Sequence, residues 1–157
     1  MFRNGTIQGV VVRDIPKHVD ERGWLSEVFR TDELDPSYVP VMGYVSMTAP
    51  DVVRGPHEHV DQSDHFAFLG PSSFTLYLWD NRPSSPTFGI RQVLCAGGDA
   101  PRSIIIPPGV VHAYKNIGCV SGMVLNFPNR LFAGEGKKNP VDEIRHESDP
   151  ASPYRID

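Results

Sequence analysis

Three of the six histidines in this 157-residue chain lie close together, at His57, His59 and His65. Residues two apart in an extended strand point to the same face, so we expect the side chains of His57 and His59 to project together. Two imidazoles that converge on one barrel interior suggest either a metal site or an acid–base pair.

A segment further along the chain carries another candidate, His112. Residues 107–109 read Pro-Pro-Gly, and this turn could lead into a strand that places His112 in the same cavity. The alternative is a set of unrelated histidines, each satisfied by backbone groups or solvent. For the set as a whole we favour the shared site.

Short strands have to position these side chains. The chain holds 14 glycines and 15 prolines without a collagen-like period, which favours many short strands and turns over a helical bundle. The pattern predicts a sandwich or barrel, with a jelly roll as the leading arrangement and one domain over residues 1–157. The candidate strands cover residues 6–12, 24–29, 41–47, 65–69, 73–79, 88–94, 103–106, 110–114 and 123–127, and residues 31–36 are the expected helical turn.

Composition argues against several classes of partner. A net charge of −4 without any basic run is a poor footprint for nucleic acid. No stretch approaches about 18 apolar residues, so we expect no membrane span, and residues 1–5 lack the apolar core of a signal peptide. Cys95 and Cys119 are too few for a disulfide framework and show no metal-ligand spacing. We therefore expect reduced cysteines in or near the core of a cytoplasmic protein.

Two spaced motifs resemble those of the cupin superfamily. The first is His57-x-His59-x4-Asp64-x5-Gly70, and the second runs from Pro107 through Gly109 and His112 to Asn116. The resemblance implies an all-β fold, a cupin jelly-roll barrel or sandwich. In metal-binding cupins the matching positions hold one divalent ion, and here the ligands would be His57, His59, Asp64 and His112, with Asp where Glu is usual.

A more specific resemblance rests on four motifs in order. Residues 20–29 read DERGWLSEVF, residues 54–57 read RGPH, residues 80–89 contain SSPTFG, and residues 107–112 fit P-x-G-x-x-H. Together they resemble the dTDP-4-dehydrorhamnose 3,5-epimerases. The resemblance implies a homodimeric carbohydrate epimerase without a cofactor or metal, acting on a nucleotide-linked 4-keto-6-deoxyhexose in deoxysugar or polysaccharide biosynthesis.

The chemistry of such a reaction explains the residue types. Hydrogens on C3 and C5 lie alpha to the ketone, so epimerisation needs a base, a donor for the enolate oxygen and an acid on the opposite face. A neutral histidine suits the base. By resemblance His57 is that base, with His59 and His112 as further catalytic groups that tune or donate. The same resemblance implies substrate-binding roles for Arg54 and His65 near the enolate oxygen, and for Arg22 and Glu27 on the nucleotide diphosphate and base, often across a dimer interface.

The chain also departs from the epimerase pattern. The strand at residues 122–127 lacks the tyrosine that serves the family as general acid, which leaves Tyr44 and Tyr114 as candidates by residue type. The family aspartate that partners the catalytic histidine has no clear counterpart. Three alternatives remain open at this point: a sugar-nucleotide 3,4-ketoisomerase, a metal-binding cupin that is a dioxygenase or sensor, and a catalytically silent nucleotide-sugar binder.

Overall fold

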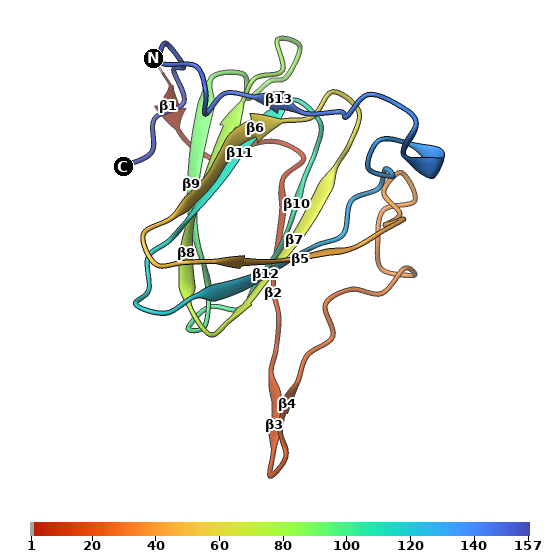
Figure 1. Ribbon diagram of the computed structural model, residues 1–157, viewed down its shortest axis with the longest axis vertical. Helices are drawn as coiled ribbons and strands as arrows, with labels where there is room; N and C mark the ends of the chain where they lie inside the picture. The colour runs from red at the N-terminus through yellow and green to blue at the C-terminus, as the bar shows by residue number, and fades with distance from the viewer. Residues whose placement is uncertain (1) are drawn as a thin grey trace.

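The computed structural model describes residues 2–157, which form two β-sheets around a common core and a small projecting hairpin (Figure 1). The larger sheet has the order β1 (Arg3–Asn4), β9 (Ile90–Gly97), β8 (Ser73–Asp80), β11 (Val110–Asn116), β6 (Val53–Glu58) and β13 (Ile144–Arg145). The smaller sheet has the order β2 (Val11–Asp14), β10 (Arg102–Ile106), β7 (Asp64–Gly70), β12 (Gly122–Asn126) and β5 (Tyr44–Thr48). The hairpin consists of β3 (His18–Asp20) and β4 (Gly23–Leu25).

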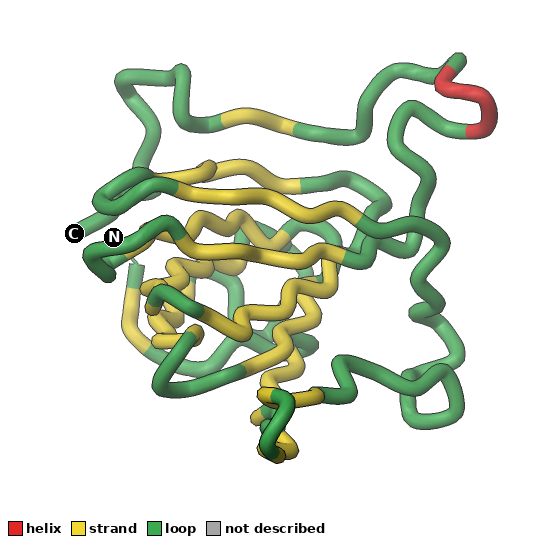
Figure 2. The backbone as a smooth tube through the Cα atoms, turned by 60° about the horizontal axis from the view of Figure 1, so that its bottom comes forward, coloured by secondary structure: helices red, strands yellow, loops and turns green. Residues whose placement is uncertain are grey.

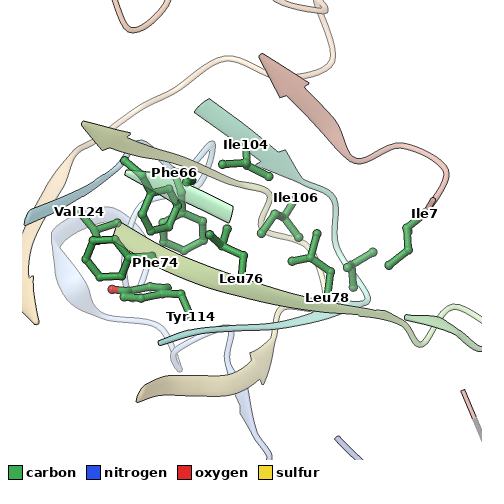
Figure 3. Close-up of a cluster of buried hydrophobic side chains, with 12 residues drawn as sticks. Ile7, Phe66, Phe74, Leu76, Leu78, Ile104, Ile106, Tyr114 and Val124 are labelled. Atoms are coloured by element: carbon green, nitrogen blue, oxygen red, sulfur yellow. The ribbon is translucent and has the colours of Figure 1, made fainter. Parts of the chain in front are cut away.

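The core lies between the two sheets (Figure 3). On β8 every second side chain faces this core, and Phe74, Leu76 and Leu78 are buried there. On the outer face of β8, Tyr77 and Trp79 are buried too, because the C-terminal segment covers that part of the larger sheet. Tyr154 packs there on Trp79, with ring centroids 5.6 Å apart. Burial on both faces explains why β8 reads as a nearly continuous apolar run.

The predicted all-β fold is confirmed, with corrections at the N-terminal end. The strand expected at residues 6–12 begins only at Val11, because the preceding residues turn to bury Ile7 in the core. The strand expected at 24–29 ends at Leu25, and residues 31–36 form turns instead of a helical turn. Cys95 and Cys119 are exposed, so their expected place near the core is wrong: Cys95 lies on the β9 face opposite the core-facing Ala96.

The β3–β4 hairpin extends away from the sheets, at the bottom of Figures 1 and 2. Its apolar side chains are solvent-exposed, to 76% for Val19 and 68% for Leu25. Within residues 2–157, the helical structure is the short 3-10 turn η1 (Glu135–Lys137), and no helix there has the length and apolar character to cross a membrane.

Candidate active site

The sheets enclose a cavity of about 730 Å³ at one end, between β5, β6, β12 and the segment before β13. Side chains from distant parts of the sequence meet at this cavity. They include Tyr44, Arg54, His57, His59, Asp64, Tyr114, Asn126 and Glu143. His112 is almost fully buried and lies opposite His57 in the β6–β11 ladder.

Local backbone geometry brings β6 close enough to β11 for this convergence. Gly55 has a φ of 85°, which favours glycine. A Cβ atom at position 55 would lie 2.6 Å from the carbonyl oxygen of His112. The glycine of the RGPH motif is therefore a steric requirement for the pairing that sets His57 beside His112.

The structure brings His57, His59 and His112 together. The ring centroids of His57 and His112 are 4.4 Å apart, and His59 lies 5.6 Å from His57 and 5.8 Å from His112. His57 is on β6, while His59 follows the last residue of that strand. The three rings cluster as expected, but only His57 and His59 line the cavity, while His112 is buried beside them.

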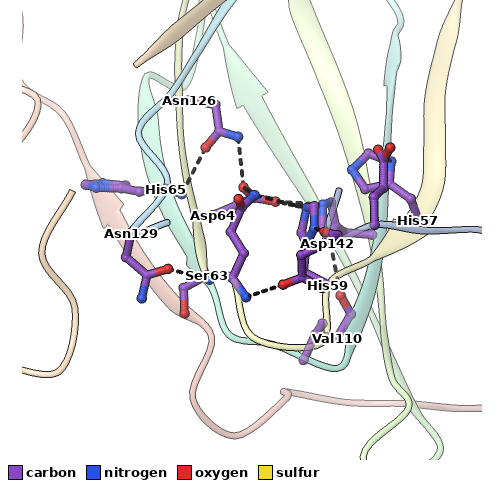
Figure 4. A network of polar contacts seen from close by, with 12 residues as sticks. His57, His59, Ser63, Asp64, His65, Val110, Asn126, Asn129 and Asp142 are labelled. Carbon is purple, nitrogen blue, oxygen red and sulfur yellow. Dashed lines mark hydrogen bonds and ion pairs between the residues drawn. The ribbon is translucent and has the colours of Figure 1, made fainter. Parts of the chain in front are cut away.

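Asp64 stands at the centre of the histidine cluster (Figure 4). Its Oδ1 accepts hydrogen bonds from Gln62 Nε2 and Asn126 Nδ2, both at 2.9 Å. Its Oδ2 lies 3.1 Å from Nε2 of both His59 and His112. Burial alone would raise the pKa of Asp64, but the contacts with the two histidines outweigh burial and hold the pKa well below its usual range. Asp64 is therefore a buried carboxylate.

The backbone fixes the orientation of two of these rings. His112 Nδ1 donates to the carbonyl oxygen of Val110 at 3.0 Å, and His59 Nδ1 donates to the carbonyl oxygen of Asp142. A carbonyl oxygen only accepts, so each Nδ1 carries its proton and each Nε2 faces Asp64. Burial would lower the pKa of His59, but the hydrogen bond and charge of Asp64 raise it above its ordinary value.

His57 has the opposite electrostatic environment. Burial, followed by the nearby His112, lowers the pKa of His57 to about 2, so this ring is neutral at physiological pH. Its Nδ1 lies 3.9 Å from Oε1 of Glu143. The other oxygen of Glu143 accepts a hydrogen bond of 2.8 Å from Arg145 Nε. A neutral imidazole has a nitrogen lone pair free to accept a proton, and a carboxylate beside it would stabilise the imidazolium that forms.

Glu143 was not found by sequence reasoning. It lies in the polar C-terminal segment without a recognisable motif, and it reaches the cavity because β13 pairs with β6, where Arg145 is opposite His57. Glu143 is thus a carboxylate beside His57 in a chain whose sequence offered no clear counterpart to the family aspartate.

His65 does not belong to this group. It follows Asp64 on β7 and therefore points to the opposite face of the strand, as Figure 4 shows. Its ring packs against Phe29, Tyr38 and Phe127, with centroids at 5.6, 5.7 and 6.2 Å. The expectation that His65 binds near the enolate oxygen is thus corrected: its neighbours are aromatic side chains outside the cavity.

The expected substrate-binding residues are divided between two places. Arg54 lines the cavity, where its guanidinium donates to Thr48 Oγ1 and to the Met47 carbonyl, both at 3.0 Å. Arg22 is at the turn of the projecting hairpin and is paired with Asp20, and Glu27 is exposed in the segment after β4. Neither Arg22 nor Glu27 borders the cavity of its own chain.

Two tyrosines reach the cavity from neighbouring strands. Tyr114 is buried in the core, and its hydroxyl lies 3.2 Å from Ser46 Oγ. Tyr44 is 39% exposed and borders the cavity from β5. Burial and the nearby charges of Asp64 and Glu143 raise the pKa of Tyr44, so its hydroxyl keeps its proton and remains a donor.

The histidine cluster also satisfies the chemistry of a metal site. One potential ligand atom from each of His57, His59, Asp64 and His112 lies within 4.8 Å of the others. Three imidazoles and a carboxylate suit zinc, iron or manganese. A divalent ion held there would polarise a ketone oxygen as a Lewis acid.

The fold and site together define a cupin-like protein whose cavity is equipped for proton transfer. A family model described as dTDP-4-dehydrorhamnose 3,5-epimerase matches residues 4–125. The chain belongs to this family, which confirms the motif-based resemblance and its prediction of a carbohydrate epimerase. The segment with Glu143 lies beyond the matched residues.

Individual relatives agree with this assignment. The chain is 38% identical over 127 residues to the probable low-salt glycan biosynthesis epimerase Agl13 of Haloferax volcanii, covering 80% of this chain and 81% of that protein. It is 36% identical over 128 residues to the spore coat polysaccharide biosynthesis protein SpsL of Bacillus subtilis, covering 80% and 82%. The crystal structure of a dTDP sugar isomerase from Desulfovibrio desulfuricans G20 has the same fold, with a TM-score of 0.80, 22% identity and coverage of 95% and 91%.

Proposed function

We propose that this epimerase acts on a dTDP-linked 4-keto-6-deoxyhexose and uses His57 as the base that removes a proton alpha to the ketone. The observation that carries the proposal is the position of the half-buried His57 on the wall of the cavity, with its Nδ1 3.9 Å from Oε1 of Glu143. When His57 takes a proton, the imidazolium gains the carboxylate of Glu143 as a counter-charge. This stabilises the charge that develops during proton transfer.

The enolate oxygen needs donors or positive charge beside it. Arg54 supplies a permanent positive charge at the cavity wall. His59 and His112 lie next to His57 and influence the charge around it through their contacts with Asp64. In this mechanism Asp64 keeps the two rings fixed while substrate binds, and His57 alone exchanges its proton with the sugar.

Tyr44 is the acid that we assign to the opposite side of the sugar. Both tyrosines border the cavity, but Tyr114 is buried and its hydroxyl contacts Ser46, whereas Tyr44 is 39% exposed. A phenol that returns a proton from the face opposite His57 completes an inversion at the carbon. Whether C3 or C5 is inverted depends on which of the two carbons places its hydrogen between His57 and Tyr44.

The projecting hairpin and the free cysteines bear on the oligomeric state and the cellular location of the protein. Arg22 lies exposed at the hairpin turn and does not line the cavity of its own chain, as expected if it binds the diphosphate in the cavity of a second copy. We therefore propose a homodimer in which the hairpins are exchanged. Free cysteines accord with a cytoplasmic location, where activated sugars would serve rhamnose-type deoxysugar or glycan synthesis.

Deuterium incorporation tests this proposal directly. The protein is incubated with dTDP-4-keto-6-deoxyglucose in deuterated water, and label at C3 and C5 is measured by NMR. We expect label at one or both carbons, and loss of label by at least about 10²-fold in His57→Asn. Binding of the nucleotide sugar without any label would contradict the proposal and favour a silent binding protein. Movement of the ketone to C3 would identify a ketoisomerase instead.

A further inference from the structure

The segment that carries Glu143 is fastened beside the cavity by contacts outside the reacting groups. We call residues 140–146 the strap. Its strand β13 pairs with β6, with Ile144 opposite Glu58 and Arg145 opposite His57. A ladder of two residue pairs is too short to hold a segment by itself. Other contacts must therefore set the position of the strap.

The first of these contacts is made by Asp142. Its Oδ1 accepts the N–H of Val60 at 2.7 Å, and its Oδ2 accepts the N–H groups of Asp61 and Gln62, both at 2.8 Å. One carboxylate thus satisfies three consecutive backbone donors in the loop between β6 and β7. Burial would raise the pKa of Asp142, but these three donors outweigh burial and lower it. The bonds are charge-assisted and short, which makes them stronger than neutral ones.

The second contact fastens the other end of the strap. His146 Nε2 lies 2.9 Å from Oε1 of Glu58, and the same oxygen accepts a hydrogen bond of 2.9 Å from Asn81 Nδ2. The backbone N–H of His146 donates to the carbonyl of Pro56 at 2.9 Å. Glu143 therefore lies between two fixed points on β6 and its following loop.

We propose that Asp142 is a positioning residue for the His57–Glu143 pair. This inference rests on the proposed role of His57 as the base. Asp142 and Glu143 are adjacent in the chain, so binding of the Asp142 carboxylate to the loop fixes the backbone from which Glu143 reaches to 3.9 Å from His57. Both oxygens of Asp142 are occupied by the loop, so Asp142 acts through Glu143 and does not act on the substrate.

Loss of the Asp142 carboxylate would leave three N–H groups without their acceptor. The loop and the strap would then separate, and Glu143 would move away from His57. The backbone carbonyl of Asp142, which accepts the proton of His59 Nδ1, would move with it. A displacement of about 1 Å at a proton-transfer site can cost on the order of 10²-fold in rate.

A double-mutant cycle tests whether Asp142 acts through Glu143. The variants are Asp142→Ala, Glu143→Gln and the combination, each measured by kcat and KM for deuterium incorporation. We expect each single change to lower kcat by about 10²-fold with little effect on KM, and the combination to be no slower than the slower single variant. The inference would be overturned if the losses of kcat multiply in the double variant, or if Asp142→Ala leaves kcat unchanged.

Amide hydrogen exchange provides the second measurement. In Asp142→Ala we expect faster exchange in residues 140–146 and in the 60–62 loop, with the core strands unchanged. The matched control is Asp149→Asn, because Asp149 is on the same C-terminal segment and its Oδ1 accepts only the nearby N–H of Ala151, at 2.9 Å. This control should keep the kcat of the unsubstituted protein.

A second variant, Asp142→Asn, covers the case in which Asp142→Ala does not fold. Asp142→Asn keeps one acceptor oxygen and takes its place in the same cycle, with the same expected coupling to Glu143. An unsubstituted protein that binds the nucleotide sugar without incorporating deuterium contradicts the proposed function. An active protein whose Asp142 and Glu143 variants act independently contradicts only the role of Asp142.

Discussion

Tyr44 and Asn126 are partners in register across strands β5 and β12, and their side chains share the face of the sheet that borders the cavity. Asn126 belongs to the strand in which the family tyrosine was expected, and its amide is bound to Asp64. Tyr44 therefore places a phenol on the adjacent strand β5, directly across from strand β12, which lacks a tyrosine. A register partner can occupy much the same place in a cavity, because paired side chains lie about 5 Å apart.

Replacement of Tyr44 separates proton removal from inversion. In Tyr44→Phe we expect His57 still to exchange the substrate proton with deuterium, while formation of the inverted sugar falls by about 10²-fold because the acid is missing. NMR of the sugar measures label and configuration in the same sample. Tyr114→Phe removes only a hydroxyl that contacts Ser46 and is the control, with inversion close to normal. Equal inversion in both variants would rule Tyr44 out as the acid.

Replacement of His65 tests its assignment to the aromatic cluster. The ring is buried and neither of its nitrogens has a hydrogen-bond partner among the described residues. Burial, with a smaller effect of Arg13, lowers the pKa of His65 to about 4 from an ordinary 6.5. Below pH 6.5, His65 therefore takes up a proton in the unfolded chain but not in the folded protein. The free energy of unfolding falls until about pH 4. The loss amounts to about 3 kcal/mol.

The variant for this test is His65→Leu. We expect the free energy of unfolding to depend less steeply on pH between about 6.5 and 4, as measured by urea denaturation at a series of pH values. The kcat at neutral pH should be unchanged, because His65 is outside the cavity. A large loss of kcat in folded His65→Leu would show that His65 contributes to catalysis and would contradict its assignment to the aromatic cluster.

Two causes of destabilisation at position 55 can be separated: the contact of a new Cβ with the His112 carbonyl, and the strain of a positive φ. Gly55→Ala should lower the free energy of unfolding by more than the about 1–3 kcal/mol of positive-φ strain, because the new Cβ meets the His112 carbonyl. Gly89→Ala provides the comparison, since Gly89 has a similar φ of 77° and open space around its Cβ. Thermal unfolding measures both variants. Equal losses would mean that the approach of β6 to β11 tolerates a side chain.

Metal removal tests the alternative use of the histidine cluster. We expect dialysis against a chelator to leave deuterium incorporation unchanged, because the proposed base, its partner and the acid are all side chains of the protein. Elemental analysis accompanies the assay. Stoichiometric zinc, iron or manganese that is lost in His57→Ala, together with activity lost on chelation, would contradict the proposed mechanism.

Sequence reasoning reached the residues whose positions follow from local chain geometry. His57 and His59 share one strand and its extension, and the turn at 107–109 directs His112 toward them. It misplaced His65 because a one-residue step along β7 reverses the direction of the side chain, and composition does not reveal which face is inward. Glu143 was beyond its reach, because that contact depends on a long-range pairing of β13 with β6.

The short pairing of β13 with β6 has a consequence for sequence variation. A shift of one residue in this register would turn Glu143 away from His57 and bring Asp142 or Ile144 to its place. We therefore expect insertions and deletions among related chains to be tolerated in the loop between Asn126 and the strap. Within the strap, the spacing from Asp142 to His146 should stay fixed, so the length of this short segment, more than its composition, would mark the relatives that share this site.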